Sequence, residues 1–436
     1  MKNHGRLLVT FLALLILLPA LSLHALEYSD IYDTLTDFGY FNSSKNEGTT
    51  SFRSLLIPIG GRAESLGSAY TGLCDDAGYI NYNAAASCIL NDTQACAFHN
   101  SWIADSKLDT IVATTRIDNF GFGLQAGCLY LPFSEYNIFG ERVNASYYTE
   151  TNIAANISYN FLAGYDFKGL ALGATLKTAY RSVPDYTDND TDAIISFSGL
   201  EQSGLAIMAD LGMMLQFNFL KFFASRTPNV RIGISAQNLG ASITGFTSKS
   251  GIKLDDPLPT YFAAGMSCQF LPIITTTFDI KQPVNLFNPS DYQMFSFSAG
   301  FIFAFTKNFS LLTGAEFKGG NPRFSLGSEL QLSNARFNFN YTLDLTSSLN
   351  PINRISLSAK ILLGDRGRAE RQKLIDELYS KGLEYYANAE WEKAIEEWQA
   401  VLILNKRYDP AILGIESAKS QIDMYTRVRE SMFFEE

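Results

Sequence analysis

Few side chains in this 436-residue chain have the types and spacing that catalysis requires. The three histidines are His4, His24 and His99, and the first two precede the signal-peptide cleavage point described below. A lone histidine in a predicted strand is usually structural, and neither H-E-x-x-H nor G-x-S-x-G occurs. We therefore expect no enzyme activity, no catalytic residues and no cofactor.

Metal ligands with a recognisable spacing are also missing. The acidic run Asp188-Asn189-Asp190-Thr191-Asp192 resembles the start of a calcium loop, but Ala193 replaces the glycine of the sixth position and Gly199 the glutamate of the twelfth. The five cysteines form no C-x-x-C pair. We expect a solvated acidic loop here and no metal site.

The composition narrows the class of protein. Apolar residues make up 47% of the chain, aromatic residues 13% and charged residues 18%, against about 25% charged in an average soluble protein. The net charge of −10 argues against binding to nucleic acid. Disorder, collagen and coiled coil are excluded as the main content.

The first 25 residues have the layout of a secretory signal peptide. Lys2 and Arg6 precede an apolar run over 7–18, and Leu23-His24-Ala25 offers a small residue at the cut. The run is too short for a membrane-spanning helix, which needs about 20 residues, although an uncleaved anchor is the alternative. An exported chain this apolar with no second helical span is either a soluble β protein or an outer-membrane barrel.

Residues 93–363 alternate between apolar and polar side chains, as strands with one apolar face do. In the last segment, for example, Ile355 and Leu357 alternate with Ser356 and Ser358. We count fourteen segments, an even number as in bacterial single-chain barrels. Their expected bounds are 93–102, 108–117, 120–130, 148–160, 169–181, 204–218, 229–238, 260–270, 273–281, 293–304, 309–317, 323–331, 335–344 and 354–363.

The connections favour a barrel over a soluble sandwich. Links after odd-numbered segments have 5, 17, 22, 21, 11, 5 and 9 residues, whereas the others have 2, 8, 10, 2, 4 and 3. Barrels in the outer membrane have short periplasmic turns and longer external loops, and aromatic girdles at both interfaces. We predict an all-β transmembrane barrel of about 14 antiparallel strands, with loops 131–147, 182–203 and 239–259 outside.

A glycine-punctuated stretch before the barrel carries a family resemblance. Residues 59–77 read IGGRAESLGSAYTGLCDDA, and YINYNAA follows over 79–85. This pattern resembles the N-terminal signature of the FadL-like long-chain fatty-acid transporters, most closely an uncharacterised spirochaete group of that family. The secretion-associated barrel PorV is a further relative. Ala84 stands where the family usually has proline.

The resemblance implies a hatch, or plug, over residues 26–92 that fills the barrel. Arg62, Asp75, Asp76 and Asn83 would be its polar groups and would pair with lumen-facing side chains, because buried charges need partners. The alternative is a turn with solvated charges. The resemblance also implies passive uptake of a hydrophobic molecule, such as a long-chain fatty acid, across the outer membrane.

From residue 364 the chain changes to a charged, helical pattern, with 25 charged residues in 366–436. Five residues match the spacing of one tetratricopeptide (TPR) repeat: Gly382, Tyr385, Ala394, Trp398 and Val401. A plain helical hairpin is the alternative. We expect residues 364–436 to lie in the periplasm, and 366–436 could recruit a protein partner there. A scaffold or secretion component resembling PorV is therefore the alternative function.

Overall fold

The computed structural model describes residues 50–433 apart from 103–104, 138, 166, 184–203, 245–256, 287, 289–292, 319–320 and 346–351. The expected signal peptide, residues 26–49 of the expected hatch and the acidic run 188–192 lie outside the described residues.

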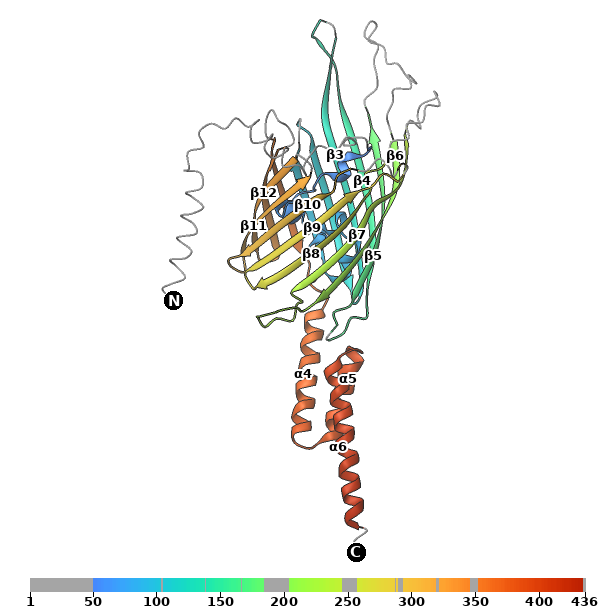
Figure 1. The fold of residues 1–436 in the computed structure, drawn as a ribbon, viewed down its shortest axis with the longest axis vertical. Helices are drawn as coiled ribbons and strands as arrows, with labels where there is room; N and C mark the ends of the chain where they lie inside the picture. Colours follow the sequence, from blue (N-terminus) through green and yellow to red (C-terminus); the bar gives the residue numbers. More distant parts are fainter. Residues whose placement is uncertain are drawn as a thin grey trace, which may run out of the picture.

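Fourteen antiparallel strands form a closed barrel (Figure 1), as the alternating pattern predicts. Each strand pairs with its neighbours in the chain, and β1 closes the barrel on β14 through pairs such as Gln94 with Leu362. The strands are β1 (Gln94–Ser101), β2 (Lys107–Ile117), β3 (Phe120–Tyr136), β4 (Arg142–Phe161), β5 (Leu170–Ser182), β6 (Gly204–Phe217), β7 (Val230–Thr244), β8 (Tyr261–Leu271), β9 (Ile274–Pro283), β10 (Ser296–Ala304), β11 (Phe309–Lys318), β12 (Asn321–Leu332), β13 (Ala335–Asp344) and β14 (Ile352–Leu362).

The prediction that residues 131–147 form a loop is wrong. β3 and β4 continue as a two-stranded ribbon, with Leu131 paired to Tyr148 and Phe133 to Ser146. Backbone pairing between these two strands decides the structure here, although Pro132 interrupts the sequence pattern. Figure 1 shows the ribbon standing clear of the other strands.

The two faces of the barrel wall differ in polarity. Large apolar side chains such as Leu124, Ile153 and Phe339 point outward and are exposed, whereas Asn156 and Lys360 point inward and are buried. This distribution is the reverse of a soluble protein and matches a wall that hydrocarbon covers. Among the described residues, no helix is long and apolar enough to cross a membrane.

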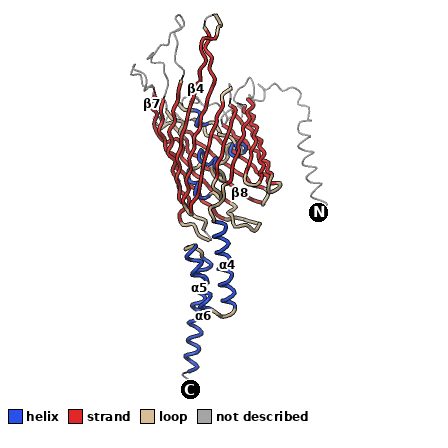
Figure 2. The backbone as a smooth tube through the Cα atoms, turned by 180° about the vertical axis from the view of Figure 1, so that it is seen from behind, coloured by secondary structure: helices blue, strands red, loops and turns tan. Residues whose placement is uncertain are grey.

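Residues 50–92, which we call the inner segment, fill the lumen (Figures 1 and 2). They form four short helices: η2 (Arg53–Leu56), α3 (Gly61–Ser65), η3 (Ala77–Asn81) and η4 (Ala84–Ile89). Inward-facing glycines of the wall allow the two backbones to touch. A Cβ on Gly173 would lie 2.1 Å from the Ala84 carbonyl oxygen, and a Cβ on Gly314 would lie 2.0 Å from the Leu66 carbonyl carbon.

Three helices follow the barrel: α4 (Arg368–Ala387), α5 (Trp391–Leu404) and α6 (Asp409–Phe433). We call the end of the barrel from which α4 leaves the helical end, and the opposite end the far end (Figure 1). The helices contact turns at the helical end. Arg226 pairs with Asp376 at 2.6 Å, and the rings of Tyr165 and Tyr408 lie 4.8 Å apart.

Candidate functional site in the barrel lumen

An ion network joins the inner segment to the wall. The Arg62 guanidinium in α3 pairs with Asp75 of its own segment. It also binds Glu329 of β12 with two nitrogens, at 2.7 and 3.1 Å. A guanidinium and a carboxylate joined in this way form the stronger kind of hydrogen bond. Arg62 therefore ties the inner segment to one strand of the barrel.

A second ion pair lies beside the first. Asp76 accepts a hydrogen bond of 2.6 Å from the Lys360 ammonium of β14, and both side chains are only 4% exposed. The Tyr70 hydroxyl lies 2.9 Å from an oxygen of Asp75 and 2.7 Å from an oxygen of Asp76. It thus bridges the two adjacent carboxylates. Asp76 also accepts from the Gly78 N–H and so begins η3.

Asn83 is separate from this network. Its side-chain oxygen accepts from the Ala85 N–H at the start of η4. Its amide donates to the carbonyl of Thr71 at 3.1 Å and to that of Met213 in β6 at 3.0 Å. The structure therefore joins Arg62, Asp75 and Asp76 in one cluster and places Asn83 against a different part of the wall.

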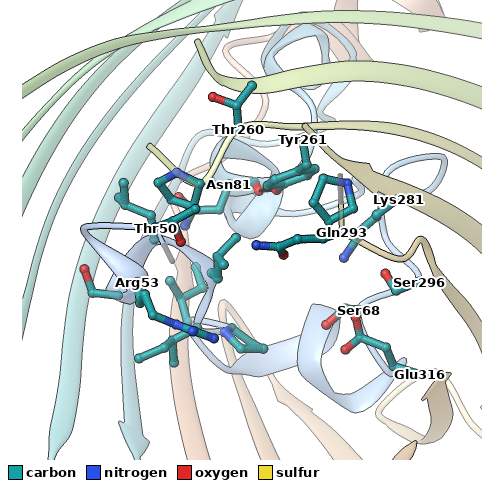
Figure 3. A pocket seen from close by; sticks show the side chains of 18 of the residues that line it. Thr50, Arg53, Ser68, Asn81, Thr260, Tyr261, Lys281, Gln293, Ser296 and Glu316 are labelled. Atoms are coloured by element: carbon teal, nitrogen blue, oxygen red, sulfur yellow. Dashed lines mark hydrogen bonds between the residues drawn. The ribbon is translucent and has the colours of Figure 1, made fainter. Parts of the chain in front are cut away.

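A cavity of about 520 Å³ lies between the inner segment and the wall (Figure 3). Side chains of residues 55–59, all apolar, line one side of it, together with Trp102 and Leu129. Tyr82 and Tyr261 also line it. The volume is within the range of about 300–1,000 Å³ that is common for small-molecule sites.

The charges around the cavity differ in their pairing. Arg323 is neutralised by Asp344 at 2.8 Å and by Glu316 at 3.3 Å. Arg53 and Lys281 form no salt bridge among the described residues, although Lys281 interacts electrostatically with the buried carboxylate of Asp279 on the same strand. The Lys281 ammonium lies 5.1 Å from the centre of the Tyr82 ring, and the carboxylate of Glu150 also lines the cavity. Figure 3 shows Arg53 and Lys281 entering the cavity from different sides. The cavity thus combines apolar lining residues with charges of both signs, and two of its cations, Arg53 and Lys281, are not held in a salt bridge among the described residues.

Sequence reasoning missed the partners that the wall supplies. These partners are Glu329 and Lys360, which are buried in the lumen, and Lys281, which lines the cavity. Each lies on an alternating strand, where the pattern predicts only that the residue faces inward. Glycines in strand interiors were the available signal, because they often mark the close approach of another backbone. Gly173 and Gly314 are such positions.

The TPR-like residues lie together in the helical extension. Ala394, Trp398 and Val401 of α5 are buried in one cluster with residues of α4 and α6. A Cβ on Gly382 would lie 2.3 Å from Trp398 Nε1, so only glycine admits the indole there. Tyr385 lies at the margin of the cluster, with the Lys381 and Lys393 ammonium groups 6.0 and 5.5 Å from its ring centre. Whether this is a true repeat stays a prediction.

Two charged groups, one beside the extension and one at its start, have shifted pKa values. A hydrogen bond to Asp376 raises the pKa of Arg226. The Ala369 N–H donates to Asp365 at 2.6 Å, just before α4, and lowers the pKa of that carboxyl. Among the described residues, no cluster of three or more His, Cys, Asp or Glu is arranged to hold a metal ion.

The fold and the lumen define a class: a closed fourteen-stranded barrel whose interior is filled by the segment that precedes it. Residues 37–366 match the family described as "Uncharacterised protein family (UPF0164)", and the chain belongs to this family. A UPF0164 protein of Treponema pallidum (strain Nichols) is 26% identical over 399 residues, which cover 89% of this chain and 88% of the relative.

Two solved structures show distant likeness. The Ralstonia pickettii toluene transporter TbuX is 10% identical with a TM-score of 0.44, and 74% of this chain and 99% of that chain are covered. A Pseudomonas aeruginosa FadL homologue is 11% identical with a TM-score of 0.40, covering 69% of this chain and 96% of that chain. These likenesses are too distant to transfer a function.

Proposed function

We propose that this protein stands in the outer membrane and lets hydrophobic molecules pass inward, with long-chain fatty acids as the cargo. The observation that carries the proposal is the lumen cavity, which has apolar lining residues and two cations, Arg53 and Lys281, that are not held in a salt bridge among the described residues. The exposed apolar face of the barrel supports the membrane location.

The cavity suits an amphiphile with one negative charge. An acyl chain gains about 0.8 kcal/mol for each CH₂ that it buries, and residues 55–59 offer the surface for it. The carboxylate of a fatty acid would approach Lys281 or Arg53. A neutral hydrocarbon would use the same apolar wall and gain nothing from either cation.

Uptake into liposomes that contain the purified protein tests this proposal. Replacing both cations (Arg53→Met with Lys281→Met) should lower oleate flux about tenfold or more, because a charge-assisted hydrogen bond contributes about 1.5–3 kcal/mol. Toluene flux should stay within about twofold, since toluene carries no charge to lose a partner. Lys307→Met, at an exposed turn, is the matched control.

Three outcomes would contradict the proposal. Equal loss of oleate and toluene flux in the double variant would show a general defect in the barrel. Unchanged oleate flux would remove the two cations from cargo binding. Flux no greater than in protein-free liposomes would remove transport altogether.

A scaffold role is the second candidate, favoured by the surface of the helical extension. Ile403, Leu413 and Met424 are 81%, 62% and 55% exposed there. Apolar side chains in such number suit a protein partner in the periplasm. Capture of one stoichiometric periplasmic partner by the full-length chain, lost in a Leu413→Ser/Met424→Ser variant that still transports oleate, would support this role.

A further inference from the structure

A group of polar side chains lies on the outside of the barrel, where the wall is otherwise apolar. His99 of β1 and Asp109 of β2 are joined by a hydrogen bond of 2.6 Å, with their side chains 41% and 47% exposed. The Tyr130 hydroxyl of β3 donates to the other oxygen of Asp109 at 3.1 Å. Ionisable groups on a surface that faces hydrocarbon are costly and usually have a role.

These three residues face outward because their chain neighbours face the lumen. Phe98 and Leu108, next to His99 and Asp109, are 3% and 1% exposed. The strand register places His99 directly opposite Asp109 and Asp109 opposite Cys128. The polar group therefore spans three adjacent strands as one continuous patch.

Two residues of the patch, His99 and Asp109, line one end of a groove of about 870 Å³ on the outer wall. Ala97, Ala126 and Ala359 line the groove, and their small side chains leave it hollow. Phe337 and Phe339 of β13 line its other side. The groove is thus mostly apolar, with hydrogen-bonding groups concentrated in one part.

The polar part lies nearer the far end of the barrel. Gln94 pairs with Leu362, close to the start of α4, so β1 rises from the helical end toward His99. Ala97 and Ala126 lie two residues below His99 and Cys128 on their strands, on the side of the helical end. Lys107, exposed and opposite Tyr130, continues the polar patch above Asp109.

We propose that this groove binds a phospholipid whose headgroup carries a primary ammonium and a phosphate. Asp109 accepts from the ammonium, while Lys107 and His99 face the phosphate. The acyl chain lies over Ala97 and Ala126 and against Phe339. Polar groups at the far end and an apolar remainder match the orientation of a lipid in one leaflet of the bilayer.

The site is separate from the lumen cavity and does not depend on transport. It depends only on the proposed membrane location of the barrel. Flotation of the protein with vesicles measures that location independently, so a failure of the lipid site and a failure of membrane insertion give different results.

Native mass spectrometry of the full-length chain, extracted from vesicles with equal phosphatidylethanolamine and phosphatidylglycerol, tests the site. The wild-type chain should retain phosphatidylethanolamine at least about fivefold over phosphatidylglycerol. His99→Leu/Asp109→Leu should lower that retention at least about fivefold, because the headgroup loses its hydrogen-bond partners. Thr178→Leu, an outward polar residue outside the groove, is the matched control and should retain the lipid.

A second variant tests the acyl part of the groove. Ala97→Phe/Ala126→Phe fills the hollow and leaves the polar patch intact, so it should also lose the lipid. Equal retention by all variants, preference for phosphatidylglycerol, or a protein dimer that His99→Leu/Asp109→Leu abolishes would each overturn the proposal. Variants that float with vesicles show that the barrel has folded and inserted.

Discussion

Lys360 and Asp76 illustrate why the buried charges of the lumen depend on each other. Each side chain is 4% exposed, and their 2.6 Å contact is the main compensation for removing two charges from water. A buried ion pair is weak evidence for stability as a whole, but removal of one partner leaves an uncompensated charge. The pair therefore fixes where the inner segment lies more than it stabilises the barrel.

We expect Lys360→Met to lower the free energy of unfolding by about 3–5 kcal/mol, because the Asp76 carboxylate stays buried without its partner. Unfolding in urea in lipid vesicles, followed by β-sheet circular dichroism, measures the change. Adding Asp76→Asn should recover part of the loss. Lys373→Met, which breaks an exposed pair with Glu377 on α4, should cost no more than about 0.5 kcal/mol; an equal loss in both variants would argue against the buried pair.

At the scale of elements, α4 begins at a carboxylate that the sequence pattern does not single out. Asp365 accepts hydrogen bonds from the Gly367 and Ala369 N–H groups, which closes the first turn. These bonds require the charged carboxylate and lower its pKa. The stabilisation is therefore present above the unfolded-state pKa of about 3.9 and is lost as the pH falls through the lower folded-state value.

Asp365→Ala should lower the temperature at which the helical circular dichroism signal is lost at neutral pH. The difference from the wild-type chain should shrink as the pH falls below the lowered pKa of the wild-type Asp365 carboxyl, because that carboxyl is then itself protonated. Asp423→Ala, in an exposed pair with Arg427 on α6, should change little at either pH. A difference that persists undiminished in acid would show that Asp365 acts by other means.

The outward and inward positions of each strand have different roles. Outward positions supply an apolar surface, and inward positions supply either hydrogen-bonding groups or glycine. Gly173 and Gly314 stand where the inner segment touches the wall backbone. Each such strand therefore forms part of the barrel wall and also contacts the inner segment. Hydrophobic alternation does not predict these contacts.

For the whole molecule, the main question is whether the inner segment must move for cargo to pass. Its four short helices are packed in two buried clusters with residues of the wall, so passage of a molecule requires some displacement. A disulfide between Ser87→Cys and Ser158→Cys would prevent displacement, because the two hydroxyl oxygens lie 2.6 Å apart. Cys88 is replaced by Ala in this variant to avoid wrong pairing.

We expect oleate uptake to fall at least about tenfold when this disulfide forms and to return on reduction, because the disulfide prevents the displacement of the inner segment. A tenfold fall corresponds to a free-energy difference of about 1.4 kcal/mol. A disulfide within the wall, from Ser325→Cys and Thr342→Cys, is the matched control, because those oxygens lie 2.9 Å apart on neighbouring strands. Full flux through the oxidised Ser87–Ser158 variant would show that the inner segment does not act as a hatch.

The sequence by itself predicted much of this protein. Alternation over 93–363 predicted fourteen strands, because the period of two follows from the geometry of any strand with one apolar face. The helical period after residue 364 predicted the extension for the same local reason. Arg62, Asp75 and Asp76 were expected to pair with lumen-facing side chains. Arg62 pairs with Glu329 and Asp76 with Lys360, whereas Asp75 pairs with Arg62 of its own segment, and the role of these residues in a hatch stays a prediction.

Which residues come into contact depends on the tertiary structure. Along the chain, Glu329 lies 267 residues from Arg62 and Lys360 lies 284 residues from Asp76, while Lys281 lies 199 residues from Tyr82. No local pattern encodes pairings across such separations. His99, Asp109 and Tyr130, beside the outer groove, are separated by only 10 and 21 residues, and the register of three consecutive strands brings them together. Register and barrel closure are properties of the whole sheet, so the chemistry of both sites appears only when the barrel has closed.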